Sequence, residues 1–462
     1  MIKTLKKYIK QHVFLSPVKE REVVEAYDLW SENYDSQPGL EKCPNGFTVP
    51  RSLSVSRRSS DACGAGAHLL NATGSNIADI LVVGGGIAGA SAAYELASFA
   101  SVVLLERESQ CGYHSTGRSA ASFTENYGGS IVRRLAIASR AFLEDPPTGF
   151  CEHPLLAPRG MMTIARADQL ELLEQQLEVA RALVPTIVKI DIPTAIARVP
   201  ILRRDYVAGA FNEPHSMEMD VDGLHQGYIR AAKARGARVV VSAGVEAIER
   251  AGEGWRVATP QGTFSAPMIV NAAGAWADEL AELAGVRALG LAPRRRTAFN
   301  IPVPPGMDIR GWPMVDDVAE EFYFKPDAGR LFVSPADATP TRPMDAYPED
   351  LDVAAGVERF ERATTLEVQR VARSWAGLRT FAPDASPVAG TDSSVDGFFW
   401  LAGQGGYGIK TSPSLSRACA SLIRERRLPD DLLRLGITAS DLSPERLRRT
   451  AAADSPLTGH PI

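Results

Sequence analysis

One stretch of the chain, ILVVGGGIAGASAAYELASFASVVLLERE (Ile80–Glu108), restricts the possible folds most strongly. An apolar run ends in glycines, an alanine-rich helical pattern follows, and a second apolar run ends in an acid. Gly84 permits a tight turn after the strand, Gly86 lets the backbone approach a pyrophosphate, and Gly89 lets the helix pack closely on the sheet. Glu106 can accept hydrogen bonds from both hydroxyls of a ribose. The stretch therefore predicts a strand–helix–strand unit that binds a dinucleotide.

The motif alone does not distinguish NAD from FAD. Two later stretches, Ile269–Gly285 and Gly397–Ile423, each combine a strand-like run, glycines and a helical pattern. The alternation of strand and helix patterns is typical of an α/β protein, whereas Glu320–Ala336 reads as a pair of antiparallel strands. A chain that returns to its nucleotide-binding fold near its C-terminus suits FAD better than NAD, because the isoalloxazine ring needs a second wall.

The composition excludes several other classes of protein. The 462 residues carry a net charge of −5 without a long basic block, so no nucleic-acid partner is expected. No apolar run reaches the roughly 18 residues of a transmembrane helix. The 5 cysteines are scattered without CxxC spacing, which argues against a metal site and a disulfide framework. We therefore expect a cytoplasmic protein, with peripheral association at the inner membrane as the alternative location.

Residues 1–76 differ in composition and residue pattern from the rest of the chain. In residues 1–15, apolar residues recur at helical spacing with lysines between them, and we interpret this segment as a plain surface helix rather than a membrane-surface helix. Residues 51–76 are rich in Ser, Arg and Gly, which is typical of a flexible linker. The sequence therefore predicts an N-terminal extension and linker over residues 1–76.

Several later stretches follow one another in the order typical of a known family of flavoenzymes. They are YHSTGRSAASFTENYGG, FCEHPLLAPRGMM, DVDGLHQGYIRAA, VNAAGAWAD, FYFKPDAG, WAGLRTFAPDASPVAG and GQGGYGIKTSP. With these motifs the chain resembles the FAD-dependent glycine/D-amino acid oxidase family, and most closely its D-arginine dehydrogenase type of D-amino acid dehydrogenase. The resemblance covers residues 77–449, and no motif of the family lies in residues 1–76.

The resemblance implies an α/β fold with two domains. A Rossmann-like FAD-binding domain would be assembled from residues 77–157, 221–288 and 371–449. A second, α+β substrate domain, built on an antiparallel sheet, would comprise residues 158–220 and 289–370. The second domain would cover the substrate face of the flavin.

The resemblance also implies which residues bind FAD. The residues that carry over are Gly84, Gly86, Ile87, Ala88, Gly89, Glu106, Arg107, Ser115, Thr116, Arg118, Ser119, Ala120, Val245, Ala273, Gly274, Gly377, Gly403, Gly405, Gly406, Tyr407 and Gly408. Some relatives attach the flavin through a cysteine just before a Pro-Asp pair near the C-terminal glycines. The corresponding stretch here, RTFAPD, has no cysteine, so the FAD is expected to be noncovalent.

Further matches imply a substrate site beside the flavin. An amino-acid dehydrogenase must hold the substrate carboxylate, and a planar guanidinium does so with two hydrogen bonds. Arg379, Arg296 and Tyr323 match the residues that bind the carboxylate, although two further arginines adjoin Arg296 and a shift of register would replace it. Tyr127 matches a loop tyrosine that closes the pocket. The remaining residues of the predicted substrate pocket are Met161, Met314, Asp316, Ser122, Thr124, Gly406 and Lys410.

The expected reaction is oxidation of the CH–NH2 group of a D-amino acid. Hydride transfer from Cα to flavin N5 would give an imino acid, which water converts to a 2-oxo acid and ammonia. The electron acceptor is left open among a quinone, a dye and oxygen. Met161 stands where arginine-preferring relatives carry an acid, so we favour apolar or broad-range substrates. Asp316 is the competing determinant, since it could replace the lost acid and favour basic substrates.

Two alternatives stay open. Arg379 and Tyr323 would also suit a sarcosine-type N-methyl amine oxidoreductase or a 2-hydroxy acid oxidoreductase of the same family. A noncatalytic flavin-binding subunit, whose residues 1–76 bind a partner protein, is the alternative from a different class. No metal ligands and no Ser-His-Asp arrangement are predicted, and His114 is interpreted as a structural histidine near the FAD.

Overall fold

The computed structural model describes residues 41–42, 48–49 and 76–450. The chain divides into two units, Met1–Gly74 and Ser75–Ile462. In the first unit the described residues form one antiparallel pair, β1 (Glu41–Lys42) with β2 (Thr48–Val49). The predicted helix of residues 1–15 and the predicted linker of residues 51–76, apart from residue 76, lie outside the described residues.

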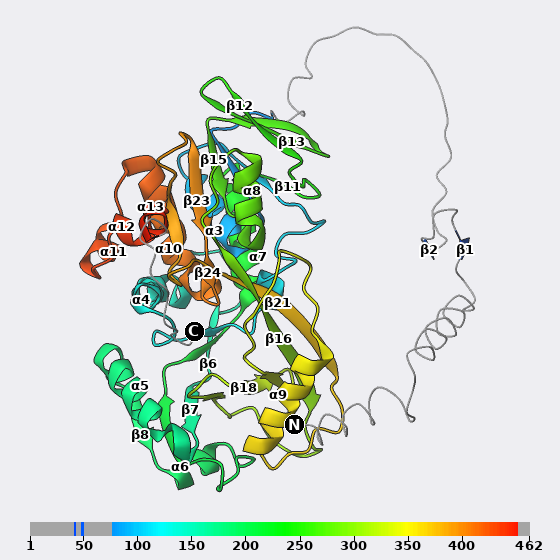
Figure 1. Ribbon diagram of the computed structural model, residues 1–462, viewed down its shortest axis with the longest axis vertical. Coiled ribbons are helices and arrows are strands. Elements are labelled where there is room, and N and C mark those ends of the chain that lie inside the picture. Colours follow the sequence, from blue (N-terminus) through cyan, green and yellow to red (C-terminus); the bar gives the residue numbers. More distant parts are fainter. Residues whose placement is uncertain (1–40, 43–47, 50–75, 451–462) are drawn as a thin grey trace. The chain divides into compact units, whose positions relative to one another are not determined.

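A six-stranded sheet forms the centre of the upper half of the second unit in Figure 1. Its strand order is β11-β4-β3-β15-β23-β22, and every neighbouring pair is parallel except β22 with β23. The order reverses between β3 and β15, as in a doubly wound fold. The strands are β3 (Ile80–Val83), β4 (Val102–Leu105), β11 (Arg238–Val240), β15 (Met268–Asn271), β22 (Val388–Thr391) and β23 (Phe398–Ala402).

The strands of this sheet are largely apolar because layers cover both of its faces. Ile80 and Val82 of β3 pack into a core with three helices, α3 (Ile87–Leu96), α7 (Val221–Ala234) and α10 (Gly408–Glu425), and α4 (Ser130–Glu144) packs on α10. Leu81 and Val83 point to the other face of the sheet and pack into a second core. That core contains α8 (Ala277–Leu283) and an antiparallel sheet of β12 (Ala247–Ala251), β13 (Gly254–Thr259) and β14 (Gly262–Ala266).

A ten-stranded sheet forms the second large element, with the path β24-β21-β16-β19-β18-β17-β7-β9-β8 and β20 paired to β16. All its pairs are antiparallel except β17 with β7, which is parallel. β7 and β17 are far apart in the sequence, so no hairpin forces them to be antiparallel. Its strands are β7 (Met161–Ala165), β8 (Val188–Ile190), β9 (Gly209–Glu213), β16 (Ala292–Pro302), β17 (Met314–Asp317), β18 (Tyr323–Asp327), β19 (Arg330–Ser334), β20 (Thr339–Pro340), β21 (Arg373–Phe381) and β24 (Gln404–Gly405).

Smaller elements complete the described residues. A three-stranded sheet joins β5 (Ser122–Phe123), β10 (Met217–Met219) and β6 (Leu156–Pro158). Helix α9 (Asp350–Ala363) packs on β16 and β19, as Figure 1 shows. The other helices are α5 (Leu170–Leu183), α6 (Ile192–Arg198), α11 (Asp430–Arg434), α12 (Ala439–Leu442), α13 (Glu445–Thr450) and the short 3-10 turns Thr116–Arg118, Ala167–Gln169 and Gly274–Trp276.

The predicted fold class is confirmed: an α/β fold combines a Rossmann-like sheet with a second, largely antiparallel sheet. The strands of the Rossmann-like sheet come from three separate parts of the chain, 80–105, 238–271 and 388–402. Among the described residues, no helix is both long enough and apolar enough to cross a bilayer.

Candidate functional site

A cavity of about 330 Å³ lies between the carboxyl edge of the six-stranded sheet and one face of the ten-stranded sheet. Val83 and Leu105, at the ends of β3 and β4, and Ala272, just after β15, line one side. Side chains of β16, β18, β19 and β21 line the other. The cavity therefore occupies the point where the strand order reverses, which is where doubly wound folds bind their ligands.

The glycines at the end of β3 leave no space for side chains. A Cβ on Gly89 would lie 1.8 Å from the carbonyl oxygen of Gly84, so α3 packs directly against the turn. Gly84 itself has a φ of +108°, and a Cβ there would lie 2.4 Å from the oxygen of Ala272. The amides in the first turn of a helix have no partners within the helix. Ala88 of that turn lines the cavity, so its amide suits a pyrophosphate, whereas the amide of Ile87 already donates to Thr116 Oγ1.

Two backbone amides hold the carboxylate of Glu106 in a position to contact the ribose of a nucleotide. The side chain lines the cavity and is buried, and Oε2 accepts a hydrogen bond from the amide of Gly85 at 2.6 Å. Oε1 accepts from the amide of Glu108 at 2.8 Å. Each carboxylate oxygen retains a free lone pair for a ribose hydroxyl. The glycine turn and Glu106 thus fit a dinucleotide without rearrangement.

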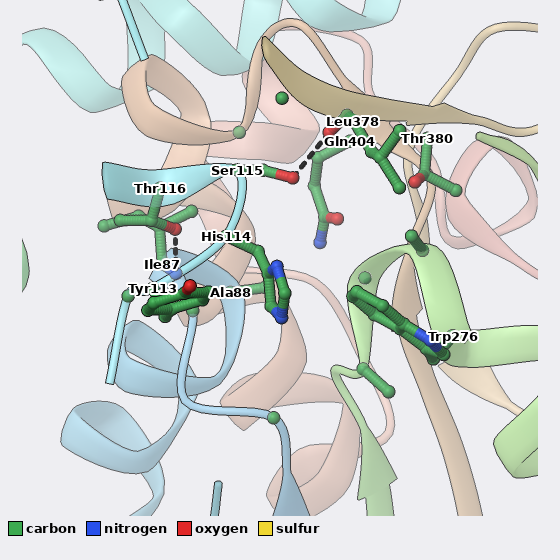
Figure 2. A pocket seen from close by; sticks show the side chains of 18 of the residues that line it. Ile87, Ala88, Tyr113, His114, Ser115, Thr116, Trp276, Leu378, Thr380 and Gln404 are labelled. Atoms are coloured by element: carbon green, nitrogen blue, oxygen red, sulfur yellow. Dashed lines mark hydrogen bonds between the residues drawn. The ribbon is translucent and has the colours of Figure 1, made fainter. Parts of the chain in front are cut away.

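One wall of the cavity is the segment Gly112–Ala120. The amide of Ile87 donates to Thr116 Oγ1 at 2.9 Å, and Ser115 Oγ donates to the carbonyl of Leu378 at 2.5 Å (Figure 2). These two hydrogen bonds tie the wall to α3 on one side and to β21 on the other. Arg118 is also held by protein groups, since its guanidinium donates to the carbonyls of Ala346 and Ala376.

The substrate end of the cavity contains Arg379, Arg296 and Tyr323. Arg379 Nη2 donates to the phenolic oxygen of Tyr323 at 3.5 Å and forms no ion pair with any carboxylate of the described residues. The Nε atom of Arg296 is buried and has no hydrogen-bond partner among the described residues. Neither guanidinium forms an ion pair with a carboxylate of the described residues, although the charge of Asp337 acts on Arg296 and that of Glu320 on Arg379 from a greater distance.

The register of the three adjacent arginines is settled by β16. Arg296 lies opposite Gly377 of β21, and both residues line the cavity. Arg295 points to the other face of the sheet, where it forms ion pairs with Asp352 at 2.8 Å and with Glu349. Arg294 does not line the cavity. The side chain named from the resemblance is thus the one that faces the site.

The two guanidinium groups change the acidity of Tyr323. Burial alone would raise the pKa of this phenol, but Arg379 and Arg296 favour the phenolate and bring the pKa below its ordinary value. Burial raises the pKa of Tyr127 and of Tyr407, despite the opposing effect of Arg379. Tyr323 is therefore the most acidic of these three phenols.

Most of the predicted substrate-pocket residues form a separate group beside the cavity. Met314 pairs with Met161 across β17 and β7, and Asp316 pairs with Tyr323 across β17 and β18. Paired residues share one face of a sheet, so this group continues the face that carries Tyr323. Ser122 Oγ contacts Met314 Sδ at 3.3 Å. The group adjoins the cavity but does not line it.

Lys410 is buried and holds the loop after β5. Its Nζ donates to the carbonyl oxygens of Thr124 at 2.8 Å and Tyr127 at 2.6 Å. Burial lowers the pKa of Lys410 to about 7. Thr124 Oγ1 donates to Glu213 at 2.6 Å, and the ring of Tyr127 contacts that of Tyr407 with centroids 5.2 Å apart. Lys410 thus acts on the backbone of the loop, outside the cavity lining.

The structure brings most of the predicted cofactor and carboxylate residues together around the cavity. Those that line it are Gly84, Gly86, Ile87, Ala88, Glu106, Arg107, Ser115, Thr116, Arg118, Ser119, Ala120, Val245, Ala273, Gly274, Arg296, Tyr323, Gly377, Arg379, Gly405, Gly406 and Gly408. Those that do not line it are Gly89, Gly403, Tyr407, Tyr127, Met161, Met314, Asp316, Ser122, Thr124 and Lys410.

Several lining residues had not been assigned to the site from the sequence. The rings of His114 and Trp276 point toward one another, with centroids 4.7 Å apart, and the amide of Gln404 projects beside Leu378 and Thr380 (Figure 2). Each of these five residues stands within a motif already singled out; Trp276 lies two positions from the predicted contact Gly274, and the other four are next to a predicted contact. A prediction that included every residue of each motif would have identified all five. Among residues 76–450, no three His, Cys, Asp or Glu side chains cluster so as to hold a metal ion.

Several known proteins are similar to this chain in sequence. A family model described as "DAO: FAD dependent oxidoreductase" matches residues 79–422. The mitochondrial dimethylglycine dehydrogenase of Rattus norvegicus is 25% identical over 384 residues, which cover 78% of this chain and 44% of that protein. Glycine oxidase of Geobacillus kaustophilus is 24% identical over 375 residues, covering 78% of this chain and 96% of that protein.

A solved structure shares the fold. The crystal structure of L-proline dehydrogenase from P. horikoshii matches with a TM-score of 0.69 at 21% identity, covering 80% of this chain and 98% of that one. At this identity the likeness concerns the fold alone. The chain spans less than half the length of the rat dimethylglycine dehydrogenase that it matches, 44%.

Proposed function

Because this chain belongs to the DAO family of FAD-dependent oxidoreductases, we propose that it oxidises the CH–NH2 group of D-amino acids. The product is an imino acid, which water converts to a 2-oxo acid and ammonia. FAD, when bound, accepts the hydride of the substrate Cα. The six-stranded sheet with its glycine turn holds the cofactor, and the ten-stranded sheet provides the substrate side.

The observation that carries this proposal is that Arg379 forms no ion pair with a carboxylate of the described residues. Its guanidinium lies in the same cavity as the dinucleotide-binding glycine turn and donates a hydrogen bond to the hydroxyl of Tyr323. A buried charge without a counter-ion is costly, so the site favours a ligand that brings an anion. A carboxylate matches the planar fork of a guanidinium with two parallel hydrogen bonds. Arg296 and Tyr323 complete the carboxylate site.

The remaining lining residues keep this end of the cavity dry. Ala298, Phe332 and Leu378 line it with apolar side chains. Apolar walls exclude water and strengthen the attraction between the guanidinium and the carboxylate. The three charged or acidic residues at this end are the ones that bind the carboxylate. With these three groups assigned to the carboxylate, we propose that the substrate amine gives its proton to bulk water before it enters the cavity and binds in the neutral form.

The side-chain preference follows from the group beside the cavity. Met161 offers an apolar surface, and burial raises the pKa of Asp316 well above its usual value, an effect that Glu320, Asp317 and Glu213 strengthen. Burial disfavours the charged form of Asp316, which accepts a hydrogen bond from Thr163, and this weakens it as a counter-charge to a cationic side chain. We therefore propose apolar or broad-range D-amino acids as substrates, ahead of D-arginine and D-lysine.

The FAD is proposed to be noncovalent. The stretch RTFAPD contains no cysteine, and the described cysteines Cys111, Cys151 and Cys419 do not line the cavity. Acid or heat should release the flavin from the precipitated protein. Flavin that stays with the precipitate would contradict a noncovalent site.

A second candidate function is oxidation of an N-methyl amino acid. The relative from Rattus norvegicus bears the name dimethylglycine dehydrogenase, and a carboxylate site of Arg379, Arg296 and Tyr323 suits such a substrate equally well. The two functions differ in the bond oxidised. Removal of hydride from an N-methyl group yields formaldehyde, whereas removal from Cα yields a 2-oxo acid.

A substrate panel with a dye acceptor distinguishes these functions. The panel comprises D- and L-amino acids, sarcosine, dimethylglycine and 2-hydroxy acids, each assayed with and without oxygen. Turnover of D-amino acids with 2-oxo acid as product supports the proposal, and formaldehyde from sarcosine supports the second candidate. A chain that holds FAD but turns over none of these would be a noncatalytic flavin-binding subunit.

A further inference from the structure

The carboxylate of Asp345 contacts three side chains of the cavity wall Gly112–Ala120. It accepts from Arg118 Nη2 at 2.5 Å and from the hydroxyl of Tyr113 at 3.3 Å, and it lies 3.9 Å from Nδ1 of His114. All three of those residues line the cavity. Asp345 stands more than 200 positions later in the chain, between β20 and α9, and contributes nothing to the lining itself.

The next residue, Ala346, contacts both Arg118 of the wall Gly112–Ala120 and the residues around Trp276 on the opposite side of the cavity. Its carbonyl accepts from Arg118 Nη1 at 2.9 Å, and its side chain is buried with Ala275, Leu378 and the indole of Trp276. The ring of Trp276 contacts that of His114, with centroids 4.7 Å apart (Figure 2). The two residues Asp345–Ala346 therefore contact both of the walls that meet at His114 and Trp276. We call them the clasp.

The wall Gly112–Ala120 is held by uncharged hydrogen bonds within the cavity and by an ion pair at the clasp. Inside, Thr116 and Ser115 hold the wall through uncharged hydrogen bonds to backbone groups of Ile87 and Leu378. Outside, the wall is held by a charge pair whose carboxylate is 33% exposed. Burial would raise the pKa of Asp345, but Arg118, Tyr113 and His114 bring it below its usual value, so the carboxylate stays charged at neutral pH.

We propose that the clasp closes the cavity over the bound FAD and that Asp345 is the residue that sets how fast FAD leaves. Opening requires that Tyr113, His114 and Arg118 separate from the Ala346–Trp276 side, and this separation breaks the charged contact between Arg118 and Asp345. Asp345 is a positioning residue, since it acts on FAD through the wall and does not touch the cavity. The proposal depends on FAD binding and not on which substrate is oxidised.

The test compares two carboxylate variants of the FAD-loaded protein. Asp345→Asn removes the charge at the clasp, whereas Asp431→Asn removes a similarly exposed carboxylate that pairs with Arg417, and neither Asp431 nor Arg417 lines the cavity. After dilution, the rise in fluorescence of released FAD gives the dissociation rate. Asp345→Asn should release FAD about fivefold faster or more, and Asp431→Asn should release it at the wild-type rate. Equal rates for wild type and Asp345→Asn would overturn the proposal.

Two further measurements keep the test decisive if Asp345→Asn does not fold. A partly exposed charge pair is screened by salt, so added salt should speed FAD release from the wild-type protein, and a release rate independent of salt would overturn the proposal. Tyr113→Phe removes one contact to the clasp and should raise the release rate by about twofold. A release rate unchanged in Tyr113→Phe would contradict the proposal.

Discussion

Arg379 Nη2 lies 3.5 Å from the hydroxyl of Tyr323 inside the cavity, and among the described residues it has no carboxylate to pair with. If this guanidinium binds the substrate carboxylate, Arg379→Ala removes one partner of a buried charge pair. Such a change typically costs about 2–5 kcal/mol, so kcat/KM should fall by roughly 30-fold or more. Steady-state kinetics at limiting substrate concentration measure this directly.

Two controls separate this role from a structural one. Arg379→Lys keeps the charge but loses the planar fork, so its kcat/KM should lie between those of the wild type and Arg379→Ala. Arg310→Ala removes an 88% exposed arginine and should leave the kinetics unchanged. Flavin content should stay normal in all three variants. Wild-type kinetics in Arg379→Ala would mean that the carboxylate is held elsewhere, with Arg296 as the next candidate.

The acidity of Tyr323 predicts a pH effect. Because Arg379 and Arg296 lower the pKa of Tyr323, the phenolate forms in the free enzyme below the usual tyrosine value of about 10. The phenolate neutralises the guanidinium groups and repels a carboxylate, so kcat/KM should fall as pH rises through that pKa. Tyr323→Phe should lose this alkaline decline. An unchanged alkaline limb in the variant would assign the decline to another group.

The contact of Gly89 with Gly84 predicts loss of cofactor on a minimal substitution. A Cβ at Gly89 would lie 1.8 Å from a backbone oxygen, so Gly89→Ala must push α3 away from β3 and displace the amides of Ile87 and Ala88. Purified Gly89→Ala should contain little FAD, measured by its visible absorbance. Gly311→Ala is the matched control, because a Cβ there meets nothing within 4 Å. Full FAD content in Gly89→Ala would contradict this account of the cradle.

Lys410 predicts a pH dependence of stability. Its pKa is about 7 in the folded protein, against about 10.4 in an unfolded chain. Between these values the unfolded chain binds more protons, so the contribution of Lys410 to the free energy of unfolding increases as pH rises through this window. Glu213, Glu125 and Arg133 are the other charged groups acting on it. Melting temperatures of wild type and Lys410→Met, compared across this window, measure the effect.

The comparison with Lys410→Met has a definite sign. At pH 7 the wild-type protein bears most of the cost of a buried ammonium, and that cost declines toward pH 10. The melting temperature of wild type should therefore rise relative to that of Lys410→Met over this range. A difference between the two proteins that does not vary with pH would show that Lys410 titrates normally.

The nucleotide site could be predicted from the sequence because its determinants are local. The spacing of Gly84, Gly86, Gly89 and Glu106 specifies a turn, a helix start and a strand end within one short stretch. Arg296 could be named only through family resemblance. Strand geometry places alternate residues on opposite faces, but it does not say whether Arg295 or its neighbours face the cavity.

Long-range contacts account for what could not be predicted. The parallel pairing of β7 with β17 leaves no trace in either strand's pattern. Lys410 was assigned to the substrate pocket from the sequence, but in the structure its Nζ donates hydrogen bonds to the carbonyl oxygens of Thr124 and Tyr127. The direction of a backbone carbonyl cannot be predicted from residue types. Asp345 belongs to no motif, because its contacts depend on how the loop between β20 and α9 returns to the cavity wall.

The measurement that tests the central claim most directly is reduction of the bound flavin without oxygen. The purified protein is mixed anaerobically with D-leucine or D-methionine, and its visible absorbance is followed. The account predicts that the flavin band bleaches, that one 2-oxo acid and one ammonia form per flavin reduced, and that the L-enantiomers leave the flavin oxidised. A flavin that stays oxidised with every D-amino acid, yet bleaches with sarcosine and yields formaldehyde, would contradict it.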